Sequence, residues 1–144
     1  MIAIASDHGG FELKSKLIES LKDIEFLDLG THTPDRVDYP FFADKLCRAI
    51  LANQVRNGIL ICGTGIGISM RANRYNGIRA ALVYNEFTAE MAKVHNNANI
   101  LCLGGRTTPI ETAIKMISIW NNASFEEGRH VERIQHLDAP LTTK

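Results

Sequence analysis

The chain has 144 residues, with 16 Lys and Arg against 16 Asp and Glu, a formal net charge of zero and 45% hydrophobic residues. This composition predicts one folded domain over residues 1–144, and it argues against a broad basic face for nucleic acid and against a membrane span. Three cysteines do not make a disulfide framework and the N-terminus lacks a basic leader, so we expect a reduced protein of the cytoplasm.

Short apolar runs and stretches of helical period alternate along the first half of the chain. Residues 1–5 and 24–29 predict strands, and residues 59–62 form a run typical of a strand that is buried on both faces. A helix is expected from Phe11, and another carries the apolar residues between positions 42 and 50. The polar face of the first helix is expected to hold Lys14, Lys16, Glu19 and Lys22.

The second half repeats this alternation. The elements expected there are, in order, a helix over residues 65–74, a strand over 78–83, a further helix, a strand over 99–103, a helix from Pro109, a short helix over 126–135 and a loose tail over 137–144. In the helix between the two strands, the inward stripe is expected to hold Phe87, Met91 and Val94. Alternating strands and helices predict an α/β fold, a three-layer α/β/α sandwich with a Rossmann-like five-stranded parallel sheet.

Open parallel sheets bind ligands beyond the carboxyl ends of their strands, and the loop after the third strand is the most distinctive. In this loop Cys62 is followed by three alternate glycines, which are Gly63, Gly65 and Gly67. Such a loop exposes backbone N–H groups to an anion, although its spacing fits neither a P-loop nor a dinucleotide fingerprint. A thiol there can act as a base or a nucleophile, whereas a free cysteine is otherwise a small buried apolar residue, as we expect for Cys47 and Cys102.

Histidines and arginines near other strand ends are further candidates. His8 follows Asp7 and His95 ends a helix, where either one can contact a substrate or simply cap the helix. Arg129 and Arg133 lie four apart, as a phosphate-binding pair or as solvated surface residues, and Arg106 follows the fifth strand. No H-x-x-x-H, C-x-x-C or H-E-x-x-H spacing occurs, so we expect no metal.

Short motifs rich in glycine and polar residues stand in order along nearly the whole chain. They are Ser6-Asp7-His8-Gly9-Gly10-Phe11, Asp28-x-Gly30-Thr31, Asp38-Tyr39-Pro40, Cys62-Gly63-Thr64-Gly65-x-Gly67-x-Ser69, Gly77-Ile78-Arg79-Ala80, His95-Asn96, Gly104-x-Arg106 and Gly128-Arg129-His130-x-x-Arg133. Together they resemble the ribose-5-phosphate isomerase type B family, which also includes galactose-6-phosphate and allose-6-phosphate isomerases. Glu127 is a departure, because the family commonly carries a glycine there.

The resemblance implies an aldose–ketose isomerase of the pentose phosphate pathway that acts through an enediolate. Cys62 would be the base with Thr64 beside it, His95 would open the sugar ring, and the amides from Gly63 to Gly67 would hold the enediolate oxygens. The substrate would be bound by Asp7, His8, Tyr39, Gly63, Gly65, Gly67, Asn96, Arg106, Arg129 and Arg133. His32, His130 and His136 receive no role.

The resemblance also implies a homodimer or a dimer of dimers, with the site between subunits and with no metal or organic cofactor. Two alternatives stay open: a hexose-6-phosphate isomerase with a roomier pocket, and a non-catalytic sugar-phosphate sensor that needs no reactive thiol.

Overall fold

The apolar runs of the sequence become the strands of a central sheet, because a run without polar gaps can be buried on both faces. The computed structural model describes residues 1–141, and in it the strands form a five-stranded sheet in the order β2-β1-β3-β5-β4. The strands are β1 (Ile2–Ser6), β2 (Phe26–Asp28), β3 (Asn57–Cys62), β4 (Ala80–Leu82) and β5 (Ile100–Gly104). All neighbouring pairs are parallel, which confirms the predicted sheet.

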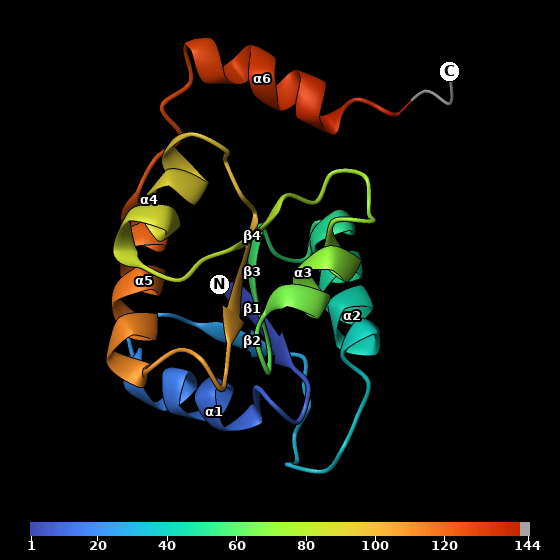
Figure 1. Cartoon of the computed structure of the whole chain (residues 1–144), viewed down its shortest axis with the longest axis vertical. Helices are drawn as coiled ribbons and strands as arrows, with labels where there is room; N and C mark the ends of the chain where they lie inside the picture. The colour runs from blue at the N-terminus through green and yellow to red at the C-terminus, as the bar shows by residue number, and fades with distance from the viewer. Residues whose placement is uncertain (142–144) are drawn as a thin grey trace.

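Helices cover both faces of this sheet and complete the predicted three layers. On one face lie α1 (Phe11–Ser20), α4 (Glu86–Val94) and α5 (Ile110–Asn122), and on the other lie α2 (Tyr39–Leu51) and α3 (Ile66–Ala72) (Figure 1). Alternate residues of the central strands point into the two separate cores, so that Ile59 and Ile61 face one and Leu60 and Cys62 the other. The last helix, α6 (Arg129–Asp138), lies apart from both layers at the top of the view.

Two predicted side-chain orientations are wrong. Lys14, expected on the solvent face of α1, is only 1% exposed because its Nζ lies 2.7 Å from Oδ1 of Asp28 at the end of β2. Phe87, expected on the inward stripe of α4, is 69% exposed, and the buried residues of this helix are Ala89 and Ala92. Small alanines let α4 pack closely, so the large ring is left outside.

Several predicted boundaries also differ from the structure. The edge strands β2 and β4 are shorter than predicted, and the last helix begins at Arg129 rather than at residue 126. The reason for the late start is the backbone, because Glu127 and Gly128 have φ angles of 63° and 57°, outside the helical region. The predicted tail overlaps α6 as far as Asp138, and its residues 142–144 lie outside the described residues.

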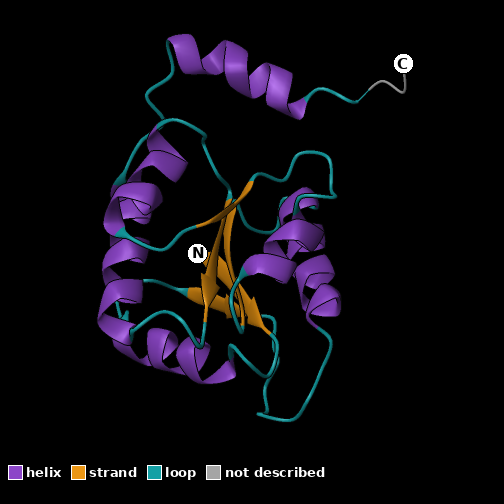
Figure 2. Cartoon of the chain, viewed as in Figure 1, coloured by secondary structure: helices purple, strands orange, loops and turns teal. Residues whose placement is uncertain are grey.

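The parallel arrangement divides the polar loops between two edges of the sheet. We call the edge where the strands end the carboxyl edge, and the edge where they begin the amino edge (Figure 2). Loops that follow strands therefore meet at the carboxyl edge, as the sequence predicts. Among the described helices, none has the length and apolar character needed to cross a bilayer.

Candidate active site

The loop that follows β3 places a thiol against the backbone at the carboxyl edge. Cys62 is the last residue of β3, and its Sγ accepts a hydrogen bond of 3.1 Å from the backbone N–H of Gly65. Gly65 has φ +81°, and a Cβ there would lie 2.7 Å from Cδ1 of Leu82 and 2.9 Å from the backbone carbon of Leu103. Only glycine fits this turn, so the sequence of the loop dictates where the amide meets the sulfur.

The other two cysteines share a core with Cys62, which is 5% exposed, but they lie deeper in it. Cys47 and Cys102 are completely buried in one of the two cores, as predicted. Burial raises the pKa of the Cys47 thiol to about 12. Burial also raises the pKa of the Cys102 thiol well above its ordinary value. These thiols stay protonated at neutral pH, which leaves Cys62 as the cysteine next to the polar loops.

The loop after β5 brings an arginine to the same place. The N–H of Gly105 donates to the carbonyl of Cys62 at 2.8 Å, and the N–H of Arg106 donates to the carbonyl of Gly63 at 2.9 Å. The guanidinium of Arg106 covers Gly63, where a Cβ would lie 3.2 Å from Nη1. A cavity of about 390 Å³ opens beside this arginine, and its lining includes His8 and the ion pair of Lys16 with Glu12. The guanidinium of Arg106 on its wall suits an anionic ligand.

The first strand contributes Asp7 and His8 to this edge. The carboxylate of Asp7 is buried, and its Oδ1 accepts a hydrogen bond of 3.1 Å from the N–H of Gly10, so it also stabilises the turn before α1. His8 is half-buried, and its Nδ1 lies 3.2 Å from both the backbone N and the carbonyl O of Val37. The loop that leads to α2 thereby orients the His8 ring.

Tyr39 and Thr64 complete the group at the carboxyl edge. The Tyr39 ring lies against Gly67, where a Cβ would be 2.7 Å from its Cζ and 2.8 Å from its hydroxyl oxygen. Thr64 is exposed, and its hydroxyl accepts a hydrogen bond of 3.2 Å from the N–H of Ile66. The structure thus brings together nine predicted site residues, which are Asp7, His8, Tyr39, Cys62, Gly63, Thr64, Gly65, Gly67 and Arg106.

The remaining predicted residues lie at the amino edge. His95 follows α4 and precedes β5, whose far end, Gly104, is paired with Cys62 in the sheet. Asn96 is its neighbour, and Arg129 and Arg133 are on α6, which lies at the opposite end of the molecule from α1 in Figure 1. Within one chain the structure therefore does not bring His95 or the arginine pair to Cys62.

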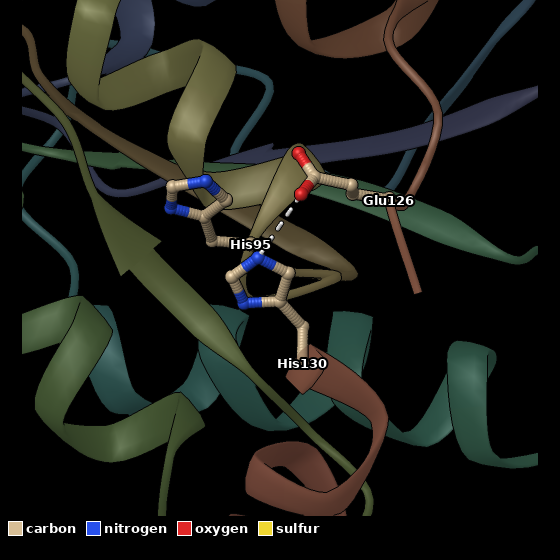
Figure 3. Close-up of side chains that lie close together, drawn as sticks. All are labelled: His95, Glu126 and His130. Carbon is tan, nitrogen blue, oxygen red and sulfur yellow. Dashed lines mark ion pairs between the residues drawn. The ribbon is translucent and has the colours of Figure 1, made fainter. Parts of the chain in front are cut away.

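One residue at the amino edge was not predicted to take part. His130 is 3% exposed, and its ring stacks on that of His95 with centroids 4.4 Å apart. Its Nε2 lies 3.5 Å from Oε1 of Glu126 (Figure 3). In the sequence, His130 stands in the last of the family motifs without an assigned role, and its spacing of four from Glu126 is common on helix surfaces.

Sequence relatives of this chain are named as sugar-phosphate isomerases. The model of the family described as Ribose/Galactose Isomerase matches residues 2–137. Ribose-5-phosphate isomerase B of Escherichia coli is 39% identical over 140 residues, covering 96% of this chain and 94% of the relative. A putative sugar phosphate isomerase of Rickettsia bellii is 48% identical over 139 residues, covering 95% and 96%.

Solved structures agree over nearly the whole chain. A ribose 5-phosphate isomerase from Thermotoga maritima superposes with a TM-score of 0.93 at 49% identity, covering 95% of this chain and 96% of its own. Ribose-5-phosphate isomerase B from Mycoplasma genitalium, solved with bound ribulose-5-phosphate, superposes with a TM-score of 0.90 at 43% identity, covering 95% and 93%.

Proposed function

The chain belongs to the ribose/galactose isomerase family, and on that premise we propose that it is an aldose–ketose isomerase that interconverts ribose 5-phosphate and ribulose 5-phosphate. A relative named ribose-5-phosphate isomerase B supports the proposal, and so does the solved relative with bound ribulose-5-phosphate. The observation that carries it is the Cys62 thiol at the carboxyl edge, whose Sγ accepts the N–H of Gly65 at 3.1 Å in the loop whose Gly63 lies under the guanidinium of Arg106. We place the reaction in the pentose phosphate pathway of the cytoplasm.

The chemistry needs one base that moves a proton between two neighbouring carbons. Cys62, as the thiolate, removes the proton from C2 of the open-chain aldose, and the electron pair forms the C1=C2 bond of an enediolate. The proton then returns to C1, while the hydroxyl proton of O2 passes to O1, so that O1 becomes a hydroxyl and C2 becomes the ketone. Backbone N–H groups from Gly63 to Gly67 hold the oxygen that carries the developing negative charge, and Thr64 lies beside them.

The far end of the substrate needs groups that hold a phosphate. Arg106 lies over Gly63 next to the thiol, and His8 lines the same cavity. Both groups are within one chain and suit a phosphate or the sugar hydroxyls near it. Asp7 and Tyr39 are placed to contact the hydroxyl groups of the sugar.

A second copy of the chain supplies the groups that one copy cannot bring to Cys62. We assign ring opening to His95 of that copy, substrate binding to its Asn96, and phosphate binding to its Arg129 and Arg133. Large apolar residues near the Cys62 loop support such an interface, because they remain exposed on the single chain. They are Ile66, Met70, Leu82, Tyr84 and Phe87. We therefore expect a homodimer or a dimer of dimers.

An isomerase assay with paired substrates tests the activity. The purified chain is expected to turn over ribose 5-phosphate with a higher kcat/KM than allose 6-phosphate or galactose 6-phosphate. A preference for either six-carbon phosphate would assign the chain to the hexose-phosphate branch of its family. Sugar-phosphate binding without any turnover would indicate that the chain is a non-catalytic sensor and not an isomerase.

Mixing two impaired variants, assayed with ribose 5-phosphate well below the wild-type KM, tests the shared site. In a dimer of Cys62→Ala and Arg133→Ala chains, one of the two sites regains both wild-type residues. After subunit exchange, random pairing is expected to restore roughly a quarter of wild-type activity. Activity no higher than that of the separate variants would show that each pocket is complete within one chain.

A further inference from the structure

Three potential metal ligands converge at the amino edge, outside the group that surrounds Cys62. His95 caps the end of α4, Glu126 belongs to the linker between α5 and α6, and His130 is in the first turn of α6. One ligand atom from each residue lies within 4.8 Å of the other two, and all three side chains meet in Figure 3. The backbone holds the linker in place, since the N–H of Glu126 donates to the carbonyl of Val94 at 2.9 Å.

The most unusual member of this cluster is His130. Its side chain is 4% exposed, and within the described residues its Nε2 has no hydrogen-bond partner. A buried nitrogen without a partner is unfavourable, because it has lost its contact with water and gained nothing in exchange. Oε1 of the Glu126 carboxylate lies 3.5 Å from this nitrogen, beyond hydrogen-bond geometry. The His130 nitrogen and the Glu126 carboxylate therefore face each other without forming a hydrogen bond.

We propose that His95, Glu126 and His130 bind a divalent transition-metal ion such as Zn²⁺. Two imidazole nitrogens and one carboxylate oxygen are a ligand set that Zn²⁺ accepts, with a fourth position left for water or another ligand. The ion would give Nε2 of His130 the partner that it lacks. Sequence spacing could not reveal this set, because its members come from α4, a linker and α6.

The stacked rings decide what binding would do to His95. The planes of the two imidazoles are 18° apart, so one ion cannot lie in both planes without rotation of a ring. His95 is half-buried and His130 is buried, so His95 is the ring free to turn. The ligand atoms must also approach one another, since zinc–ligand distances are about 2.0–2.2 Å. Metal binding therefore moves His95 away from its metal-free orientation.

This movement has a consequence for catalysis that rests on the proposed function. A His95 nitrogen whose lone pair is bound to Zn²⁺ cannot exchange a proton with the ring oxygen of a sugar, and the turned ring no longer presents its other nitrogen in the metal-free orientation. The ion would therefore act as an inhibitor, and isomerase activity and metal binding would exclude each other. The inference concerns a regulatory site, since the proposed reaction needs no metal.

Binding of Co²⁺ tests the site without any need for enzyme activity. The untagged full chain, first treated with a chelator, is titrated with Co²⁺ while its visible absorption is recorded, and Zn²⁺ is added to displace the bound ion. We expect one Co²⁺ per chain. Glu126→Gln and His130→Gln should each weaken binding at least about tenfold, with circular dichroism to confirm that the variants are folded.

The chain offers matched controls for this experiment. His136 and Glu132 form another histidine–glutamate pair on α6, with 4.0 Å between Nε2 and Oε1, so Glu132→Gln should leave Co²⁺ binding unchanged. Cys47→Ala should also bind Co²⁺ normally, because this thiol is completely buried in the core against α2. Absence of saturable binding, or equal binding by Glu126→Gln and Glu132→Gln, would overturn the proposal.

Isomerase assays with added Zn²⁺ then test whether metal binding at this cluster inhibits the enzyme. The rate of each protein is compared with its own zinc-free rate, and we expect wild type to be inhibited at Zn²⁺ concentrations that spare Glu126→Gln. Equal inhibition of both would contradict an inhibitory site at this cluster. A chain that binds Co²⁺ through these residues but isomerises no sugar phosphate would overturn the proposed function and leave the metal site standing.

Discussion

At the carboxyl edge, backbone groups define the site, whereas at the amino edge side chains on helix ends define it. The Cys62 sulfur receives the N–H of Gly65, and the loops after β3 and β5 are joined by hydrogen bonds from Gly105 and Arg106. The groups at the amino edge rest on ring stacking between His95 and His130, and on the ion pair of Arg79 with Asp138, 2.8 Å long, that ties α6 to the chain.

The difference indicates what each edge is suited to do. Proton transfer requires a base that is held accurately against its oxyanion donors, and strand ends that are bonded to each other provide this accuracy. Phosphate binding, the role proposed above for the arginines of the amino edge, relies on charge and needs less accurate placement. Five changes test whether the two edges differ in this way.

Loss of the thiol should have the largest effect. Cys62→Ala is expected to lower kcat by about 10²–10⁴-fold, the contribution typical of a general base, while binding of ribose 5-phosphate is retained. Steady-state kinetics and calorimetric titration measure the two quantities. Cys47→Ala is the control and should keep the wild-type kcat, and an active Cys62→Ala would reject the base assignment.

Breaking the ion pair between Lys14 and Asp28 should have the next largest effect, a loss of unfolding free energy. Asp28→Asn leaves the almost fully buried ammonium of Lys14 without its carboxylate and should cost about 3 kcal/mol of unfolding free energy. Lys14→Met should cost less, because Asp28 is 33% exposed and still accepts a hydrogen bond from the N–H of Gly30. Urea unfolding measures both, and the reverse order would contradict this account of Lys14.

Gly65 and Gly77 have similar φ angles and lie at opposite edges of the sheet, so alanine substitutions there compare how tightly the two edges are packed. Gly65→Ala places a Cβ 2.9 Å from the Leu103 backbone and should lose about 1–3 kcal/mol through overpacking, in addition to the strain of its φ of +81°. Gly77, which precedes β4, has φ +87°, and a Cβ there meets only Cδ2 of Leu51, at 3.3 Å. Gly77→Ala should therefore lose only the unfolding free energy that the positive φ costs at both positions. Equal losses in the two variants would show that the carboxyl edge is not more tightly packed.

Loss of one arginine of α6 should weaken substrate binding more than it slows turnover. If Arg133 holds the phosphate, Arg133→Ala should raise KM roughly tenfold or more, since charge-assisted hydrogen bonds are among the stronger ones. Its kcat should change much less. Arg56→Ala removes an exposed arginine elsewhere at the amino edge and should leave KM unaltered. An unchanged KM in Arg133→Ala would count against the phosphate assignment.

The smallest effect concerns Lys93, in the last turn of α4. Burial lowers the pKa of its ammonium, which lies 4.8 Å above the Trp120 ring. The folded state then binds fewer protons than the unfolded state between the two pKa values, so this residue stabilises the fold more as pH rises. The Tm of Lys93→Met should therefore exceed that of wild type by the largest amount near neutral pH, where the Lys93 ammonium is charged. Thermal unfolding between about pH 8 and pH 10.5 measures whether the difference in Tm from wild type shrinks.

Local pattern determined the main elements and the location of the Cys62 loop. Strand and helix periods depend on residues a few positions apart, so the parallel sandwich could be predicted from alternation alone. Because parallel strands end at one edge, the sequence also predicted that His8, Cys62 and Arg106 lie at the same edge. Their roles in catalysis stay predictions.

Only the tertiary structure decided the rest, since burial and distance depend on segments far apart in the sequence. Lys14 has the pattern of a solvated residue, and its burial follows from Asp28 on another element. The placement of His95 across the sheet from Cys62, and the convergence of Glu126 and His130 on it, required the path of the chain through β5, α5 and α6. A periodic pattern contains no information about such long-range contacts.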